Sequence, residues 1–514
     1  MQPTMIRLLD VQPRVLFLLV AAFSAWLCAV LPVFSQEAYY WLYAQHPDFS
    51  YFDHPPLVAW SIWLGTHAFG DCTIGVRAAT WAWGLGTTAL GMLLAREFGL
   101  GRKGQNLWIL ASLASPILAM THFLANPDAP LVCCWTAVMV ALWRARSGAF
   151  GWWVVAGIAA GAALLAKYSA AFLAIGGMAL LLADAPLRRQ LRTPKPWLAV
   201  MIAAVVFLPV VAWNLHHDFE SFGFQTTGRY AKGHLGVHWL AEFAGEQFLV
   251  VHPVLAIAMV AAVFWLVRRW RGDPRARFVL AFGVPLPAWF LANSLFIQVK
   301  LNWLAPAIVP LTLGAIVWWC ERGIASVQPK VARAATWSFL LVPITAVIAP
   351  VLTLLPARAG TSWTGWEEIA ARAEAWEDRL DPVDGVEGNF FYFAADYRDA
   401  AQLARNLLVL RRGENPAEHP GASSVDFEPT LAQNVFGQSA LQFDHWASPG
   451  HRIGQDALFV LPRAHLREAV LPRVMPHFES VALAEHVAVR RLGIEVFDAD
   501  IYVCRGYRGP IAAR

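Results

Sequence analysis

Charged side chains are scarce in this sequence. They make up 15% of the 514 residues, whereas an ordinary soluble protein carries about 25%. Hydrophobic residues make up 57%. This composition excludes a soluble globular enzyme and a disordered chain. The net charge of +4 comes from basic residues in short loops, so nothing in it indicates a nucleic-acid partner.

Cysteine and nucleotide-binding motifs are also scarce. The six cysteines form no CxxC pair, so a disulfide framework or a zinc ribbon is not expected. There is no GxxxxGK followed by Ser or Thr, no GxGxxG after a strand, no HExxH and no GxSxG. The sequence therefore does not support an ATP-driven or other nucleotide-dependent activity, and any activated substrate must reach the protein already activated.

The charges that are present are spread unevenly. Residues 1–355 hold 24 Lys or Arg and 14 Asp or Glu, while residues 356–514 hold 16 and 22 in less than half that length. Long apolar runs with few charges are typical of membrane segments. We therefore predict a membrane domain over residues 1–355 and a water-soluble domain over residues 356–514.

Eleven charge-poor runs are long enough to approach the roughly 20 residues that a helix needs to cross a bilayer. The sequence thus predicts an α-helical polytopic membrane protein with about 11 transmembrane helices. The runs are 15–34, 75–95, 105–122, 128–143, 151–166, 168–184, 197–213, 250–267, 278–297, 303–320 and 335–355.

Basic residues in the connecting loops predict the orientation, because cytoplasmic loops are enriched in Lys and Arg. With the N-terminus in the cytoplasm, that side carries nineteen basic residues and the opposite side five. Eleven crossings then place residues 356–514 outside, in the periplasm of a Gram-negative cell. In that tail, alternating or apolar stretches predict strands, and residues 366–380 and 397–410 are expected to be helical, so the tail is read as a small α/β domain.

The outer loops hold the candidate site, since ionisable residues at membrane depth are costly and need a reason. The first outer loop, between the first two crossings, reads as two short surface helices joined near residues 51–56, and it carries Glu37, Asp53 and His54. A carboxylate at the edge of the low-dielectric region suits a general base. The structural alternatives are a solvated interfacial acid for Glu37 and helix capping before Pro55-Pro56 for Asp53-His54.

Cationic and amide side chains in the other outer loops are candidates for binding a sugar phosphate. They are Lys167, Arg229, Lys300 and Asn302, and His54 of the first outer loop is a further candidate for this role. A lysine at such a position commonly snorkels to the headgroups instead. Helix capping is the favoured reading of Asn126-Pro127-Asp128. A metal site at His216-His217-Asp218 is a minority alternative, and a divalent cation (Mg, Mn or Zn) is possible without any assigned ligands.

Two blocks of the first outer loop carry a specific resemblance. Residues 36–41 (QEAYYW) and 51–60 (YFDHPPLVAW) resemble the first outer loop of membrane glycosyltransferases of the GT-C superfamily. They look most like the group of aminoarabinose transferases and dolichyl-phosphate-mannose protein mannosyltransferases. Weaker matches follow at residues 127–130, 166–168, 213–214, 221–222, 302–306, 365–367 and 442–446.

The resemblance implies a GT-C fold and a sugar donor carried on polyprenyl phosphate. The implied acceptor is a cell-envelope glycolipid of the lipid A type, or a protein as the alternative, and a single displacement would invert the anomeric carbon. The resemblance also assigns the catalytic role to an acidic residue of the first outer loop, either Glu37 or Asp53. Many relatives have Asp-Glu where this chain has Gln36-Glu37, so the resemblance does not decide which of the two acids is the general base. Two alternatives belong to other functional classes. One is a transporter or flippase of lipid-linked sugars, and the other is a non-catalytic assembly subunit.

Overall fold

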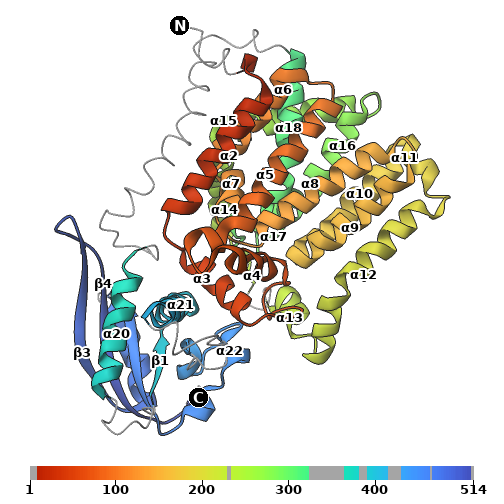
Figure 1. Ribbon diagram of the computed structural model, residues 1–514. Coiled ribbons are helices and arrows are strands. Elements are labelled where there is room, and N and C mark those ends of the chain that lie inside the picture. Colours follow the sequence, from red (N-terminus) through yellow and green to blue (C-terminus); the bar gives the residue numbers. More distant parts are fainter. Residues whose placement is uncertain are drawn as a thin grey trace. The chain divides into compact units, whose positions relative to one another are not determined.

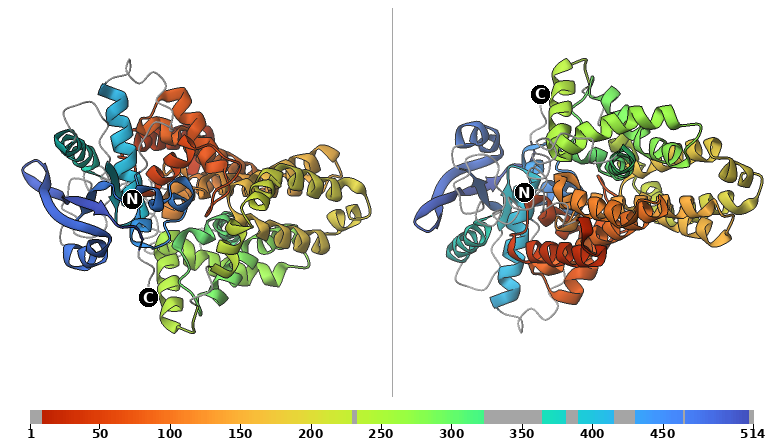
Figure 2. Two further views of the ribbon diagram at one scale, coloured as in Figure 1. Left: turned by 90° about the horizontal axis from the view of Figure 1, so that it is seen from below. Right: turned by 90° about the horizontal axis from the view of Figure 1, so that it is seen from above.

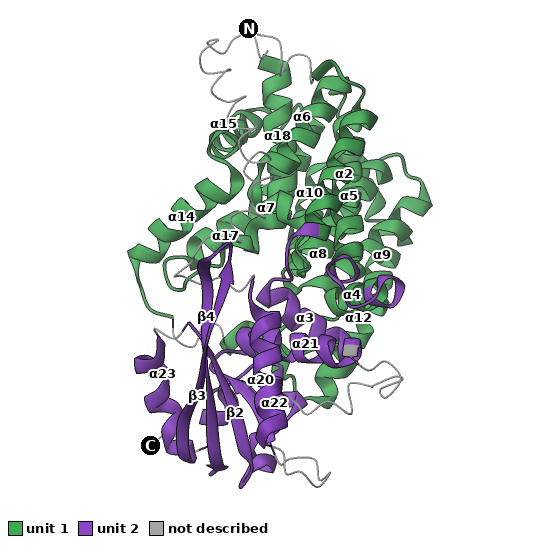
Figure 3. Ribbon diagram, turned by 60° about the vertical axis from the view of Figure 1, so that its left-hand side comes forward, with its two compact units in different colours: residues 1–29, 49–65, 77–347 green, residues 30–48, 66–76, 348–514 purple. Residues whose placement is uncertain are grey.

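The computed structural model describes residues 9–228, 233–322, 364–380, 390–414, 430–463 and 466–510. The chain divides into two compact units (Figure 3). Unit 1 comprises Met1–Ala29, Phe49–Gly65 and Arg77–Val347, and unit 2 comprises Val30–Asp48, Thr66–Val76 and Ile348–Arg514. The predicted domain boundary at residue 355 lies outside the described residues and stays a prediction. The division of the first outer loop between the two units was not predicted.

Unit 1 is a bundle of helices (Figure 1). Each of the first ten predicted crossings contains a helix, and the eleventh, 335–355, lies outside the described residues. Outside the first outer loop, the helices of this unit include α2 (Pro13–Val30), α5 (Thr73–Glu97), α6 (Gly101–Ala114), α8 (Asp128–Ala145), α9 (Phe150–Ala166), α10 (Phe172–Ala183), α12 (Pro194–His216), α14 (Val237–Val251), α15 (Pro253–Arg269), α16 (Pro274–Gly283), α17 (Pro285–Asn293) and α18 (Ala305–Arg322).

The number of crossings is not fixed by these helices. Within the described ranges, five spans are long and apolar enough to cross a membrane, and α14 with α15 forms a sixth if this pair, bent by 106°, counts as one span. Proline explains the bend, because Pro253 cannot donate a backbone hydrogen bond within a continuous helix. The predicted polytopic helical fold is confirmed, and the count of eleven stays a prediction.

Small residues let α9 and α12 pack closely. A Cβ at Gly157 would lie 2.6 Å from the carbonyl oxygen of Ala199, and one at Gly161 would lie 2.5 Å from the Cβ of Val206. Such approaches are typical of helix pairs in lipid, where packing replaces the hydrophobic effect as the driving force. Helices α9, α10 and α12 stand to one side of the helical unit in both views of Figure 2.

Unit 2 contains a four-stranded sheet in the order β1-β2-β4-β3. Strand β1 (Phe390–Ala394) runs parallel to β2 (Asp456–Pro462), while β4 (Ile494–Tyr507) is antiparallel to β2 and to β3 (Phe478–Arg491). Helices α20 (Trp366–Leu380) and α21 (Tyr397–Glu414) complete the α/β arrangement. The small C-terminal sheet domain expected from the sequence is therefore confirmed. Unit 2 also contains α3 (Ser35–Gln45).

Candidate active site

The ends of three helical segments of unit 1 meet at a buried carboxylate. Lys167, which follows α9, donates from Nζ to Oδ1 of Asp128 at 2.7 Å. Asn302, in the short helix η4 (Leu301–Leu304), donates from Nδ2 to the other carboxylate oxygen. The side chains of Lys167 and Asp128 are only 11% and 4% exposed. The fold thus brings two predicted phosphate-binding residues together around Asp128, for which the sequence favoured only a helix-capping role.

This arrangement changes two expectations. Lys167 does not snorkel outward, because its ammonium is buried in an ion pair. Capping at the start of α8 is performed by Asn126, whose Oδ1 accepts hydrogen bonds from the backbone N–H groups of Asp128 and Ala129 at 3.0 and 3.2 Å. The capping interpretation is therefore right for Asn126 and incomplete for Asp128. Because each charge has a partner here, removing either one would leave the other buried and uncompensated.

The loop after α12 folds back onto Tyr168, the residue next to Lys167. The hydroxyl of Tyr168 and Oγ of Ser221 lie 2.7 Å apart. Asn214 fixes that loop, since its Oδ1 accepts a hydrogen bond from the backbone N–H of Phe222 at 3.2 Å. These contacts connect the Lys167-Tyr168 turn and the loop after α12 within unit 1.

Asp53 and His54 lie in a tight turn before α4 (Leu57–Phe69). The backbone N–H of Tyr51 donates to the carbonyl oxygen of His54 at 3.1 Å. Asp53 is 5% exposed, and its carbonyl oxygen accepts a hydrogen bond from Nε2 of Gln225 at 2.6 Å. Nε2 of His54 lies 3.9 Å from a carboxylate oxygen of Asp53. The backbone of Asp53 is therefore held from two directions, while its carboxylate faces an imidazole.

The other predicted residues of unit 1 lie apart from this group or outside the description. Lys300 precedes η4, is exposed, and forms no ion pair with any residue of the ranges given above. Arg229 lies outside the described residues. The ring of His217 stacks on Trp213 with centroids 3.8 Å apart, and its Nδ1 is 2.8 Å from the carbonyl oxygen of Trp213.

Nothing in the part of the chain that the structure describes gathers three His, Cys, Asp or Glu side chains into a possible metal site. The minority metal reading of residues 216–218 therefore finds no support there. The divalent cation stays a prediction.

Glu37 belongs to unit 2, where it lies on the first turn of α3. It is fully buried, and its Oε2 accepts a hydrogen bond from the backbone N–H of Phe34 at 2.8 Å. The reading of Glu37 as a solvated interfacial acid is thus wrong. A carboxylate at the N-terminus of a helix is favoured by the free N–H groups and by the helix dipole.

Helix α3 is fixed within unit 2 by contacts that the sequence did not reveal. Nε1 of Trp41 donates to Oδ1 of Asp71 at 2.8 Å, and the guanidinium of Arg412 on α21 pairs with the other carboxylate oxygen. Asp71 therefore joins α3 to α21. The hydroxyl of Tyr39 accepts a hydrogen bond from the backbone N–H of Gln442 at 3.1 Å.

Comparison with known proteins gives consistent results. Residues 53–213 match the family described as Dolichyl-phosphate-mannose-protein mannosyltransferase. The chain is 29% identical over 325 residues to the lipid A galacturonosyltransferase RgtD of Rhizobium johnstonii (strain DSM 114642 / LMG 32736 / 3841). That match covers 59% of this chain and 65% of the relative, so the chain spans less than two thirds of the curated relative's length.

The fold is similar to that of a solved structure. The structures of ArnT from Cupriavidus metallidurans, in the apo state and bound to undecaprenyl phosphate, each superpose with a TM-score of 0.62 at 16% identity. Each superposition covers 95% of this chain and 97% of ArnT. The family match and the relative agree with the resemblance found in the sequence, and the superposition confirms the predicted fold class.

Proposed function

We propose that this chain, whose fold is that of the GT-C glycosyltransferases, transfers a sugar from a polyprenyl-phosphate carrier to lipid A. Two observations support the substrates: the relative from Rhizobium johnstonii is a lipid A galacturonosyltransferase, and ArnT has been solved with undecaprenyl phosphate bound. We further propose a multi-pass inner-membrane protein with its N-terminus in the cytoplasm and unit 2 in the periplasm, as the distribution of Lys and Arg predicts.

The observation that carries the proposal is the buried carboxylate of Asp53 in a turn held by Gln225. A carboxylate removed from water interacts more strongly with a nearby proton donor or with developing positive charge than one in solution. Asp53 is therefore assigned to the acceptor hydroxyl and to the sugar ring.

In the proposed reaction, the acceptor oxygen attacks the anomeric carbon while the bond from that carbon to the carrier phosphate breaks. Asp53 accepts the proton of an acceptor hydroxyl, and the phosphate leaves with the bonding electron pair. A single displacement inverts the anomeric carbon. With a phosphate acceptor no base is needed, and the same carboxylate orients the acceptor and stabilises the oxocarbenium-like ring.

The leaving phosphate needs positive charge. The ammonium of Lys167 is already neutralised by Asp128, so its role is to hold the Asn302 end of the site in place through that shared carboxylate. Lys300, exposed and not ion-paired within the described ranges, is assigned to the carrier phosphate. Arg229 and His54 are further candidates for this contact.

Glu37 is the alternative candidate for the general base, and its hydrogen bond with Phe34 allows a capping role to be distinguished from a catalytic one. A glutamine at position 37 keeps an oxygen that can accept the hydrogen bond from the Phe34 N–H, but it removes the negative charge. If Glu37 only caps α3, Glu37→Gln changes transfer by less than about tenfold. If Glu37 is the base, transfer falls by about 100-fold or more, as expected for general base catalysis.

The substrates are tested by mass spectrometry of lipid A and of envelope glycoproteins from a deletion strain of the source organism. Complementation with the wild-type chain, Asp53→Asn or Glu37→Gln follows, with equal membrane abundance verified. We expect one sugar to be missing from lipid A and to be restored by the wild-type chain but not by Asp53→Asn. An unchanged lipid A together with a lost protein glycan would overturn the lipid A assignment in favour of a protein acceptor.

A further inference from the structure

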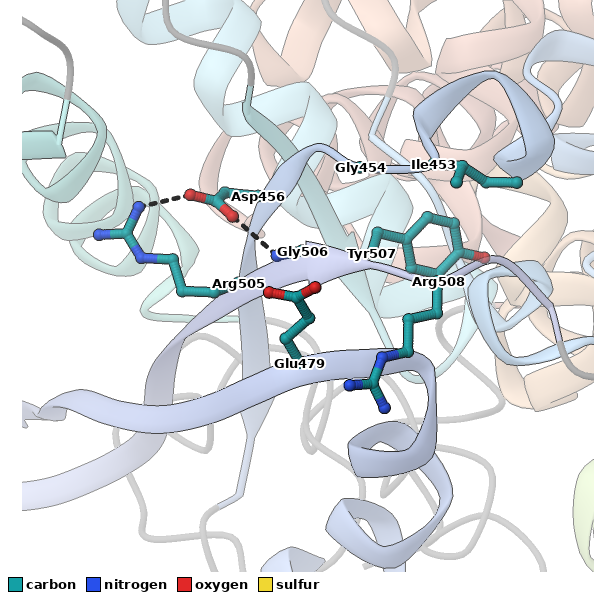
Figure 4. Close-up of a pocket in the computed structure, with 8 residues that line it drawn as sticks. All are labelled: Ile453, Gly454, Asp456, Glu479, Arg505, Gly506, Tyr507 and Arg508. Atoms are coloured by element: carbon teal, nitrogen blue, oxygen red, sulfur yellow. Dashed lines mark hydrogen bonds and ion pairs between the residues drawn. The ribbon is translucent and has the colours of Figure 1, made fainter.

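An open hollow of about 630 Å³ lies on unit 2, where the end of β4 meets β2 and the beginning of β3 (Figure 4). None of the chemistry proposed above uses it. Two acidic residues and two arginines contribute to its wall, together with backbone from two glycines. The residues are Ile453, Gly454, Asp456, Glu479, Arg505, Gly506, Tyr507 and Arg508.

One side of the hollow is an internal support. A carboxylate oxygen of Asp456 accepts a hydrogen bond from the backbone N–H of Gly506 at 2.8 Å. The other oxygen pairs with the guanidinium of Arg505. Both groups are therefore occupied with each other, and they fix the two strands rather than offering a binding group (Figure 4).

Glycine makes room for a second carboxylate. Gly506 has a φ of +59°, and a Cβ at this position would lie 2.6 Å from Cδ of Glu479. Only a residue without a side chain lets Glu479 lie across the strand at this point. The backbone next to it is also held, since the N–H of Arg508 donates to the carbonyl oxygen of His477 at 2.8 Å.

The two remaining ionic groups, Glu479 and Arg508, are exposed. Neither side chain forms an ion pair with another residue in the described part of the chain. A guanidinium matches the geometry of a phosphate and forms charge-assisted hydrogen bonds with it. A carboxylate accepts hydrogen bonds from sugar hydroxyls. Ile453, which is 60% exposed, adds an apolar surface beside them.

We propose that this hollow binds a phosphorylated saccharide, with Arg508 contacting the phosphate and Glu479 the hydroxyls. The ligand is the headgroup of the glycolipid acceptor, an identification that rests on the proposed function. The sugar phosphate of the donor offers the same chemistry, so the kinetic experiment below is designed to separate the two sources.

Binding is tested by isothermal titration calorimetry on the full chain in detergent, with glucosamine 1-phosphate and glucosamine as probes. Saturable binding of the phosphorylated sugar is expected, with the unphosphorylated sugar weaker. Arg508→Gln should weaken binding about tenfold, as loss of a hydrogen bond to a charged group predicts. Glu479→Gln should weaken binding of both sugars. Arg490→Gln is the matched control, because this arginine lies on β3 with a 68% exposed side chain and does not line the hollow.

No saturable binding, or equal losses in Arg508→Gln and Arg490→Gln, would overturn the site. In transfer assays, Arg508→Gln should raise the KM for the acceptor about tenfold and leave kcat and the KM for the donor unchanged. A rise in the KM for the donor alone would overturn the acceptor identification. If no transfer occurs with any donor, the proposed function fails, whereas the calorimetry still decides whether the hollow binds.

Discussion

The buried pair of Asp128 and Lys167 allows a quantitative test of the unit 1 site. The charged atoms are 2.7 Å apart and the two side chains are 4% and 11% exposed. Two charges in such surroundings attract each other by several kcal/mol at an effective dielectric constant near 20. Removing one partner leaves the other buried without a counter-charge and lowers the free energy of unfolding by about 3–5 kcal/mol. Removing both lowers it by far less than the sum of the two single changes.

The experiment is a double-mutant cycle with Asp128→Asn, Lys167→Met and the double variant. The free energy of unfolding is measured by SDS titration in mixed micelles, followed by the fluorescence of the 25 tryptophans. We expect a coupling energy of about 2–4 kcal/mol. The control cycle uses Arg144 and Glu97, which lie 2.8 Å apart with side chains 31% and 30% exposed, and should give about 0–1 kcal/mol. Additivity within about 0.5 kcal/mol at the buried pair would refute the reasoning.

Two further predictions concern unit 2. Asp71→Ala removes the acceptor of both Trp41 and Arg412; we expect about 1–3 kcal/mol of destabilisation and faster proteolysis of the full chain, and an unchanged cleavage rate would contradict this role of Asp71. Burial raises the pKa of Asp399 to about 6 despite the opposing charge of Arg463. The folded state therefore binds this proton more tightly than the unfolded state, so its contribution is complete below about pH 4 and is lost as the pH rises through 6. Asp399→Asn should accordingly raise the free energy of unfolding of unit 2 relative to wild type by about 2 kcal/mol more at pH 7 than at pH 4; an equal difference at the two pH values would contradict it.

Local sequence pattern was sufficient for much of the fold. Apolar runs located the helices of unit 1, and the alternating or apolar stretches of residues 356–514 predicted strands in that part of the chain. Hydropathy and alternation are local properties, so they identify helices and strands but not which of these elements contact one another. The grouping of α3 with the C-terminal segment depends on contacts such as Asp71 with Arg412, which are 341 residues apart. No periodicity encodes such a pairing.

The candidate site was predictable only in part, for a similar reason. The sequence identified Lys167 and Asn302 by residue type and loop position, and the fold joins them. It did not identify Asp128, because an acidic residue at a helix start has an ordinary capping role and its neighbour Asn126 looks alike. The distinction appears only when the ends of α8, α9 and η4 meet. A lone buried carboxylate between two donors is a tertiary feature.

The most direct test of the account measures sugar transfer by the purified chain in proteoliposomes. The substrates are lipid A and a radiolabelled polyprenyl-phosphate sugar, with the sugar chosen from the lipid A analysis. We predict transfer by the wild-type chain with inversion of the anomeric carbon, and a loss of about 100-fold or more in Asp53→Asn at unchanged abundance and elution profile. Wild-type rates in Asp53→Asn and Glu37→Gln alike would contradict the claim that a buried acid of the first loop performs the transfer.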